Sequence, residues 1–298
     1  MERRETILVA GADGQLGQAL RAVSGAWPAW RFVFVNRAQA DICCGPAWRE
    51  MARNHDATGI INCAAYTAVD RAEAEPAEAD RVNRLGAATL ADVAADEHLW
   101  LVHVSTDYVF GGEGERHPWR EEEPTAPLGV YGATKLAGEE AIRRRGGDAA
   151  LVRTSWLYSE YGHNFLKTML QRGAAGVPLR VVDDQWGRPT CATDLARALL
   201  TLVARGIRGV ETWHYTGGGR PTTWYGFAAE IFRQADIAAD LTPVATADYP
   251  TPARRPAWSV LDTARIERAG VPVPDWHAAL RACLRRMGYP VREERDEL

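Results

Sequence analysis

"TILVAGADGQLGQAL" (residues 6–20) places three glycines between a short apolar run and a stretch suited to a helix. Gly11 permits a tight turn, Gly14 lets backbone amides approach a pyrophosphate, and Gly17 lets the helix pack closely on the strand. The helix N-terminus that follows favours an anion. The spacing is GxxGxxG, not the commoner GxGxxG, and alone it would indicate no more than a turn. With a strand before it and a helix after it, the stretch predicts a dinucleotide-binding turn.

The same alternation of apolar runs and helical stretches continues along the first half of the chain. Residues 76–97 are rich in alanine and predict a helix. Strands buried on both faces are predicted over 6–11, 31–35, 59–65, 100–105 and 149–156. This order predicts an α/β fold with a doubly wound parallel sheet of the Rossmann type.

Proline and glycine become more frequent after residue 156, as in "GVPLRVVDDQWGRPT" and "YPTPARRPAW". We therefore expect residues 1–155 to form a dinucleotide-binding domain and 156–298 to form mainly a second, smaller α/β domain that binds substrate. One segment complicates this division. A helix over 193–206 is followed by "GVETWHYTG", so 192–216 is expected to return to the first domain.

The composition is that of an ordinary globular protein, with 46% hydrophobic residues, 25% charged residues and a formal net charge of −4. It lacks the positive charge that nucleic acid or an anionic membrane surface would favour. No apolar stretch approaches the roughly 18 residues of a membrane-spanning helix, and no signal peptide is evident at the start, so we expect a cytoplasmic protein. The five cysteines show neither CxxC spacing nor a nearby histidine pair, which predicts reduced, structural thiols and no metal site.

The end of the second predicted strand bears on the choice of cofactor. An acidic residue there would bind the adenosine ribose 2′-hydroxyl, but the chain has Asn36 and Arg37. Arg37 could pair with a 2′-phosphate, which favours NADPH and leaves NADH as an alternative. An arginine exposed to solvent is the competing interpretation.

Three side chains after the fourth strand form a candidate catalytic group. Thr106 follows the strand at its carboxyl end, where ligands bind in open α/β sheets. Tyr131 and Lys135 lie one helical turn apart, so we expect the lysine to lower the pKa of the phenol and the tyrosine to pass a proton to a carbonyl oxygen. Thr106 can donate a second hydrogen bond to that oxygen. A YxxxK pair alone is common, and its combination with the glycine turn and Thr106 is what favours a hydride-transfer site.

With these motifs in place, the chain resembles the extended short-chain dehydrogenase/reductases and, within them, the dTDP-4-dehydrorhamnose reductase family. The resemblance rests on "GADGQLG", "INCAAYTAVDRAEAEP", "VHVSTDYVFGG", "VYGATKLAGE", "VRTSWLY", "NFLKTML", "DDQWGRPT" and "YPTPARRP", which follow one another along nearly the whole chain. It implies reduction of the 4-keto group of dTDP-4-dehydro-β-L-rhamnose to dTDP-L-rhamnose.

The resemblance also implies contacts with the cofactor. It places Gly14, Gln15 and Leu16 on the phosphates, and Asp41 and Ile42 near the adenine. It places Ala64, Ala65 and Tyr66 along the turn after the third strand, and Tyr131 and Lys135 at the nicotinamide end.

A second set of positions is expected to face the sugar nucleotide. The resemblance places Thr106, Asp107 and Trp156 there, and the Trp156 indole could offer a flat face to the sugar. Asn164, Gln185 and either Arg254 or Arg255 could hold hydroxyls and the diphosphate. A tryptophan in the core and polar side chains in solvent are the competing interpretations.

Some positions depart from the family pattern. Gly111 stands where aspartate is common, and Trp258 where asparagine is frequent. Ala19 occupies the position of a glutamate that binds Mg²⁺ in some relatives, which puts metal dependence in doubt.

Other functions stay open at this point, including reduction of another nucleotide 4-keto sugar. An epimerase or dehydratase would be expected to carry an acid after Thr-Asp, whereas Tyr108 follows Asp107 here. A non-catalytic subunit of the same fold, like the regulatory subunit of methionine adenosyltransferase, need not keep Thr106, Tyr131 and Lys135. The sequence leaves a homodimer open.

Overall fold

Six parallel strands form the central sheet of the computed structural model, which describes residues 5–112 and 116–291. Their spatial order is β10 (Val210–His214), β5 (Ala149–Thr154), β4 (Trp100–Thr106), β3 (Ala57–Asn62), β1 (Glu5–Ala10) and β2 (Trp30–Val35). The chain runs outward from β1 to β2 and then returns past β1 to β3. This reversal opens a crevice at the carboxyl ends of the strands. The predicted doubly wound parallel sheet is confirmed.

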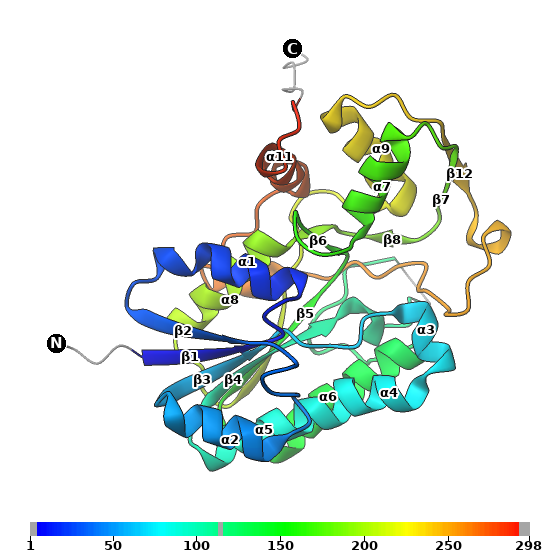
Figure 1. The fold of residues 1–298 in the computed structure, drawn as a ribbon. Coiled ribbons are helices and arrows are strands. Elements are labelled where there is room, and N and C mark those ends of the chain that lie inside the picture. Colours follow the sequence, from blue (N-terminus) through cyan, green and yellow to red (C-terminus); the bar gives the residue numbers. More distant parts are fainter. Residues whose placement is uncertain (1–4, 113–115, 292–298) are drawn as a thin grey trace.

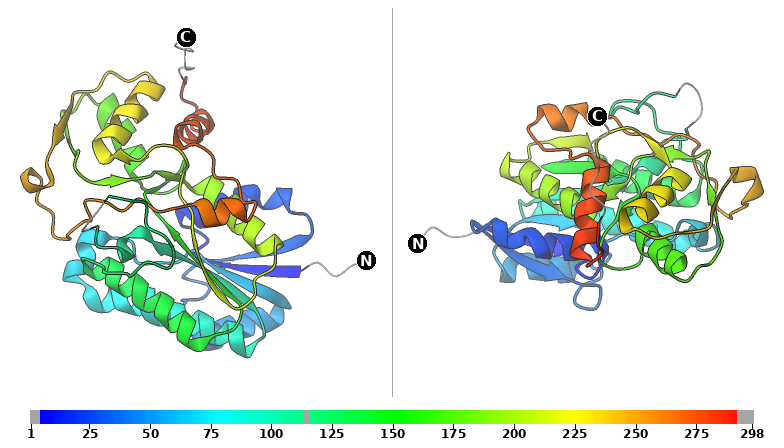
Figure 2. Two further views of the ribbon diagram at one scale, coloured as in Figure 1. Left: turned by 180° about the vertical axis from the view of Figure 1, so that it is seen from behind. Right: turned by 90° about the horizontal axis from the view of Figure 1, so that it is seen from above.

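Helices cover both faces of the sheet, as Figure 1 shows. One face carries α1 (Gln15–Val23), α8 (Ala192–Ala204) and α10 (Ala264–Arg268), which lies beside α8 in the rear view of Figure 2. The other carries α2 (Gly45–Asn54), α5 (Gly86–Asp96) and α6 (Val130–Arg145). Ile7 and Val9 point into the first core, and Leu8 points into the second. A strand covered on both sides needs such an unbroken apolar run.

The long helix predicted over 76–97 is present but interrupted. It consists of α4 (Pro76–Asp80), a π-helical segment η2 (Arg81–Leu85) and α5, and α3 (Val69–Ala74) precedes it. The π turn places the fully buried Asn83 against the loop after β3. Single π turns inside helices are frequent at functional sites.

A second layer of short strands and helices lies over the carboxyl ends of the sheet. Its core is built on α7 (Phe165–Ala174), α9 (Trp224–Ala235) and α11 (Trp276–Arg286). The short strands form the pairs β6 (Leu157–Tyr158) with β9 (Thr190–Cys191), β7 (Leu179–Val182) with β12 (Leu241–Val244), and β8 (Trp186–Gly187) with β11 (Thr222–Thr223). The remaining short helical turns are η1 (Ser24–Ala26), η3 (Asp107–Val109) and η4 (Thr246–Asp248).

Two elements from the second half of the chain belong to the layer of the central sheet, one as a covering helix and one as a strand. Helix α8 packs against α1, and β10 pairs with β5 at the edge of the sheet. The division into a cofactor domain and a substrate domain stays a prediction.

Within residues 5–112 and 116–291 we looked for membrane-spanning helices and for clusters of metal ligands. None of their helices is long and apolar enough to cross a membrane. Nor do they bring together three or more histidine, cysteine or acidic side chains that could hold a metal ion. All five cysteines are free thiols.

Candidate active site

An open cleft with about 1690 Å³ of empty space lies between the carboxyl ends of the strands and the second layer. Eleven of the predicted site residues line it: Gly14, Gln15, Leu16, Ala65, Thr106, Asp107, Tyr131, Lys135, Trp156, Asn164 and Arg255. The structure therefore brings the glycine turn, the candidate catalytic group and part of the predicted substrate set to one place.

The glycine turn forms one end of this cleft. Gly11 has φ of +77°, and a Cβ there would lie 2.7 Å from the backbone nitrogen of Ala64. A Cβ on Gly17 would lie within 3.0 Å of Gly11 and Ala12, so the close approach of α1 to β1 requires glycine. At Gly14 a Cβ would meet only the Gly11 oxygen, at 3.3 Å, and no side chain caps the helix. The uncapped amides at the start of α1 fit a pyrophosphate.

Thr106 and Tyr131 meet at the floor of the cleft. Thr106 is the last residue of β4, and Tyr131 lies in the first turn of α6. Burial raises the pKa of Tyr131 to about 12, and a hydrogen bond with Thr106 partly offsets this rise. The phenol is therefore protonated at neutral pH and available as a proton donor.

Lys135 is buried and turned toward the sheet. Its Nζ donates to the Val104 carbonyl oxygen at 2.6 Å and lies 3.3 Å from Nε2 of His103. Burial lowers the pKa of Lys135 to about 8. The expectation that this lysine lowers the pKa of Tyr131 is not met here, because its polar contacts lie with Val104 and His103 and the phenol is desolvated.

Asp107 adds a second proton-binding group beside Thr106. The Thr106 hydroxyl donates to its Oδ1 at 3.1 Å, whereas no side chain of the described residues lies in hydrogen-bond geometry to Oδ2. Burial raises the pKa of Asp107 to about 7, and interactions with the Ser259 and Thr106 side chains partly offset this rise. A buried carboxylate oxygen without a partner on the wall of a cleft is suited to a ligand donor.

Trp156 lines the same cleft and has an unusual backbone conformation. Its φ is +48°, which is rare for an aromatic residue and costs conformational energy. Its indole stacks on Trp224 with ring centroids 3.7 Å apart, and both rings line the cleft. In this stack one face of each indole is covered by the other, and contact between Trp156 and a sugar stays a prediction.

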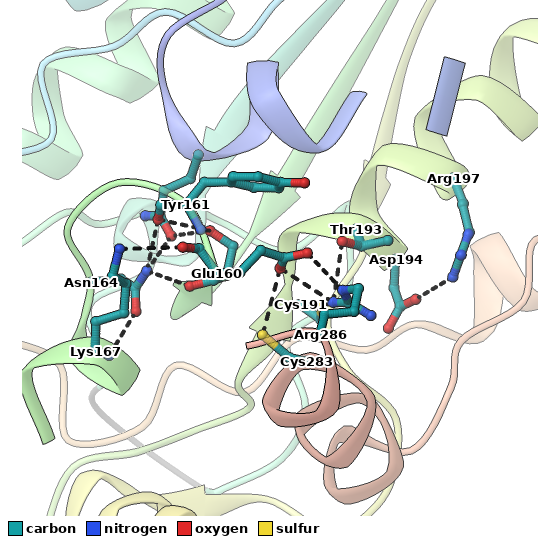
Figure 3. A network of polar contacts seen from close by, with 12 residues as sticks. Glu160, Tyr161, Asn164, Lys167, Cys191, Thr193, Asp194, Arg197, Cys283 and Arg286 are labelled. Atoms are coloured by element: carbon teal, nitrogen blue, oxygen red, sulfur yellow. Dashed lines mark hydrogen bonds and ion pairs between the residues drawn. The ribbon is translucent and has the colours of Figure 1, made fainter. Parts of the chain in front are cut away.

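The amide of Asn164 joins the second layer to the glycine turn. Its Nδ2 donates to Oε1 of Gln15 at 2.9 Å and to the Ser159 carbonyl oxygen at 2.8 Å, while its Oδ1 caps α7. Figure 3 shows Asn164 near Glu160, which pairs with Arg286 of α11. The structure thus places Asn164 in the cleft wall with its amide bound to the protein.

Two other predicted substrate contacts occupy different surroundings. Arg255 lines the cleft and pairs with Asp70 at 2.7 Å, at the start of α3. Gln185 is buried and donates to Thr246 at 3.0 Å, outside the cleft lining.

The residues predicted near the adenosine lie beyond the cleft lining. Arg37 is largely exposed at 74% and lies within 3.6 Å of Asp41 and Glu78. The Asn36 side chain holds the following turn through Gln39, and Ile42 packs beneath Gly86. After β3, Ala64 donates its N–H to Asn62, and the Tyr66 hydroxyl donates to Glu75.

Several lining residues were not predicted from the sequence. Tyr108 packs edge-to-face on Tyr131 with centroids 5.9 Å apart, and Trp224 completes the indole stack. Asn83 also contributes indirectly, since its amide donates to Tyr66 and to Thr134 of α6. Tyr108 directly follows the Thr-Asp pair, a signal that could have been used. Trp224 lies 68 residues after Trp156 (224 − 156), and no sequence pattern links them.

Comparisons with known proteins agree with this geometry. The RmlD substrate binding domain family matches residues 5–289. A dTDP-4-dehydrorhamnose reductase of Sinorhizobium fredii is 38% identical over 287 residues, which cover 92% of this chain and 95% of the relative. The dTDP-4-dehydrorhamnose reductase of Streptomyces griseus is 41% identical, with 95% of this chain and 96% of the relative covered.

A solved structure extends the comparison to the cofactor. The dTDP-4-dehydrorhamnose reductase of Bacillus anthracis, crystallised in complex with NADP, superposes with a TM-score of 0.91 at 32% identity, covering 95% of this chain and all of that one. The resemblance inferred from the motifs is confirmed. The chain therefore belongs to the dTDP-4-dehydrorhamnose reductases, a family of oxidoreductases.

Proposed function

We propose that this protein uses NADPH to reduce the 4-keto group of dTDP-4-dehydro-β-L-rhamnose to dTDP-L-rhamnose. The observation that carries the proposal is the hydrogen-bonded pair of Thr106 and Tyr131 on the floor of a cleft that begins at the uncapped N-terminus of α1. A dinucleotide on that helix and a sugar nucleotide under the second layer would meet at this pair.

The chemistry divides between cofactor and protein. NADPH, when bound, supplies the hydride that is added to C4 of the sugar. Tyr131 donates its hydroxyl proton to the keto oxygen as that oxygen gains negative charge, so hydride and proton together convert the carbonyl to a hydroxyl. When substrate is bound, the Thr106 hydroxyl would turn its single proton from Oδ1 of Asp107 to the same keto oxygen and stabilise the developing charge. Lys135 contributes to binding the cofactor.

The sugar nucleotide would lie between the two layers. Trp156, stacked on Trp224, provides an apolar face for the sugar ring. Oδ2 of Asp107 can accept a hydrogen bond from a sugar hydroxyl because it has no partner among the residues that the structure describes. The guanidinium group of Arg255 can bind the diphosphate. The diphosphate would then compete with the Asp70 carboxylate for this guanidinium group.

The preference for NADPH is assigned to Arg37. Its guanidinium is exposed, and a 2′-phosphate would compete for it with Asp41 and Glu78. Arg37→Ala should therefore raise KM for NADPH far more than for NADH, by roughly 10-fold or more for a charge-assisted contact of about 1.5–3 kcal/mol. Arg208→Ala, which removes a 90% exposed arginine, is the control. Equal effects of Arg37→Ala on both cofactors would contradict the assignment.

The deciding experiment follows NADPH oxidation by the purified protein with dTDP-4-dehydro-β-L-rhamnose, and identifies the product by mass and NMR. We expect stoichiometric formation of dTDP-L-rhamnose. The UDP form of the same sugar and a 4-keto sugar with another stereochemistry test the nucleotide base and the substrate range. Faster reduction of either one would transfer the assignment to that substrate. Absence of NADPH oxidation with all of them would instead favour the non-catalytic subunit.

A cytoplasmic location and a homodimer stay predictions. Sedimentation velocity of the purified chain tests the homodimer.

A further inference from the structure

Next to Lys135 lies a buried row of polar side chains that the proposed reaction does not use. Asn62 ends β3 and His103 lies on β4, and both are 1% exposed, as is Lys135 on α6. Asn62 Nδ2 lies 3.0 Å from His103 Nδ1, and His103 Nε2 lies 3.3 Å from Lys135 Nζ. The imidazole therefore bridges an amide and an amine in an environment without solvent.

The backbone determines the direction of the hydrogen bonds in this row. The Ala64 N–H donates to Oδ1 of Asn62 at 3.0 Å. A backbone N–H can only donate, so the Asn62 atom that faces it must be the acceptor oxygen. The amide group therefore turns its nitrogen, which only donates, toward Nδ1 of His103. Nδ1 must accept, so the proton of the neutral imidazole lies on Nε2.

This tautomer points an N–H at Lys135. Burial keeps the pKa of His103 well below its usual value, so the ring stays neutral and cannot change tautomer without breaking the bond from Asn62. An ammonium group also has only N–H donors, so two donors would face each other at 3.3 Å. A neutral amine has a lone pair that can accept from Nε2–H, and it still donates to Val104.

Other groups around Lys135 do not reverse this preference. The titratable groups that face it are Cys63 from the segment after β3, His103 from β4, and Glu139 from α6 itself. Glu139 is the nearby carboxylate, but it is bound by Arg153 at 2.8 Å and by Arg143 at 2.9 Å. Two guanidinium charges offset one carboxylate, which leaves little net attraction for an ammonium group.

We propose that His103 is a positioning residue that donates its Nε2–H to Lys135 and thereby favours the neutral amine of that lysine. This inference deepens the proposed function, because it makes the charge of Lys135 change within the working pH range. Binding the anionic NADPH would favour the ammonium form, so cofactor binding takes up a proton at Lys135. Affinity for NADPH then falls on the alkaline side, where that proton is lost.

The first test needs no substrate. ¹⁵N-histidine NMR of the whole protein distinguishes imidazole tautomers, and His103→Gln, or His103→Asn where Gln fails to fold, assigns the His103 signal by its loss. We expect the Nε2–H tautomer at pH 7. His214 is an internal control, because it should have the other tautomer, with the proton on Nδ1. Arg153 donates toward its Nε2 at 3.4 Å, and its Nδ1 donates to the Trp119 carbonyl oxygen at 3.0 Å. An Nδ1–H tautomer or a charged ring at His103 would overturn the proposal.

The second test measures NADPH affinity by fluorescence titration between pH 6 and pH 10. The wild type should lose affinity above a midpoint near pH 8, where the pKa of Lys135 lies. In His103→Gln the side-chain carbonyl can accept from the ammonium group, so the midpoint should rise by about one pH unit. His214→Gln, the matched buried control, should keep the wild-type midpoint. An unchanged midpoint in a folded His103→Gln protein would refute the role, whereas failure to reduce the sugar would refute only the proposed function.

Discussion

The Tyr131 hydroxyl is the group on which the proposed reaction depends most directly. Tyr131→Phe keeps the ring and its edge-to-face contact with Tyr108 but removes the proton donor. We expect kcat to fall by about 10²–10⁴ while NADPH affinity changes little. Stopped-flow and steady-state assays of NADPH oxidation measure both quantities. Tyr249→Phe, at an exposed tyrosine, is the control, and near-normal kcat in Tyr131→Phe would remove the residue from its role.

Asp107 makes stability depend on pH. Its pKa is about 7 in the folded protein and 3.8 in a solvated chain, so the folded state holds an extra proton between these values. Folding therefore loses stability as pH rises from about 4 to about 7, and the loss is complete above that range. The Asn side chain in Asp107→Asn cannot ionise. The difference in unfolding free energy between this variant and the wild type should therefore be more favourable to the variant at pH 8 than at pH 4, by up to about 4 kcal/mol.

Chemical denaturation at the two pH values measures this difference. Asp240→Asn removes an exposed carboxylate and should give the same small change at both. A gain for Asp107→Asn that does not depend on pH would show that the wild-type carboxyl is already neutral or solvated.

At the scale of elements, two glycines of the glycine turn are expected to have different roles, Gly17 in helix packing and Gly14 in ligand binding. Gly17→Ala would place a Cβ 2.3 Å from the Gly11 oxygen and should push α1 away from β1. We expect a loss of about 1–3 kcal/mol in unfolding free energy. Gly14→Ala meets only one atom, at 3.3 Å, and should leave stability nearly unchanged.

The same two variants should differ in the opposite way in cofactor binding. Gly14→Ala puts a methyl group where the pyrophosphate would approach, so NADPH affinity should fall by about 10-fold or more without a loss of stability. Thermal melting and fluorescence titration of both proteins provide the comparison. Equal affinity in Gly14→Ala and the wild type would place the phosphates elsewhere.

The sequence was most informative about these elements. The five strands of the first half and the glycine turn could be predicted because buried parallel strands and close helix packing restrict residue types strongly. The π turn at 81–85 and the left-handed φ of Trp156 could not, since both depend on tertiary contacts. The same holds for Lys135, whose spacing from Tyr131 predicted a shared helix face but not its contacts with Val104 and His103.

At the scale of the whole molecule, α11 is tied to the cofactor end of the cleft. Arg286 pairs with Glu160 at 2.6 Å (Figure 3). Glu160 adjoins Ser159, which donates to Gln15 at 2.9 Å. Arg286→Ala should lower the unfolding free energy by about 1–3 kcal/mol and also weaken NADPH binding. Arg268→Ala, at an exposed arginine of α10, should do neither. Lost stability with unchanged cofactor affinity would show that α11 only supports the second layer.

The edge strand β10 has a consequence for how the protein is made. Because β10 covers β5, the sheet is incomplete until residues 210–214 have been synthesised, long after the glycine turn and the catalytic residues. Until then β5, with all six residues buried in the finished protein and four of them apolar, has an open edge. Such edges pair with other chains. We therefore expect the nascent first half to be prone to aggregation on the ribosome until β10 emerges and docks.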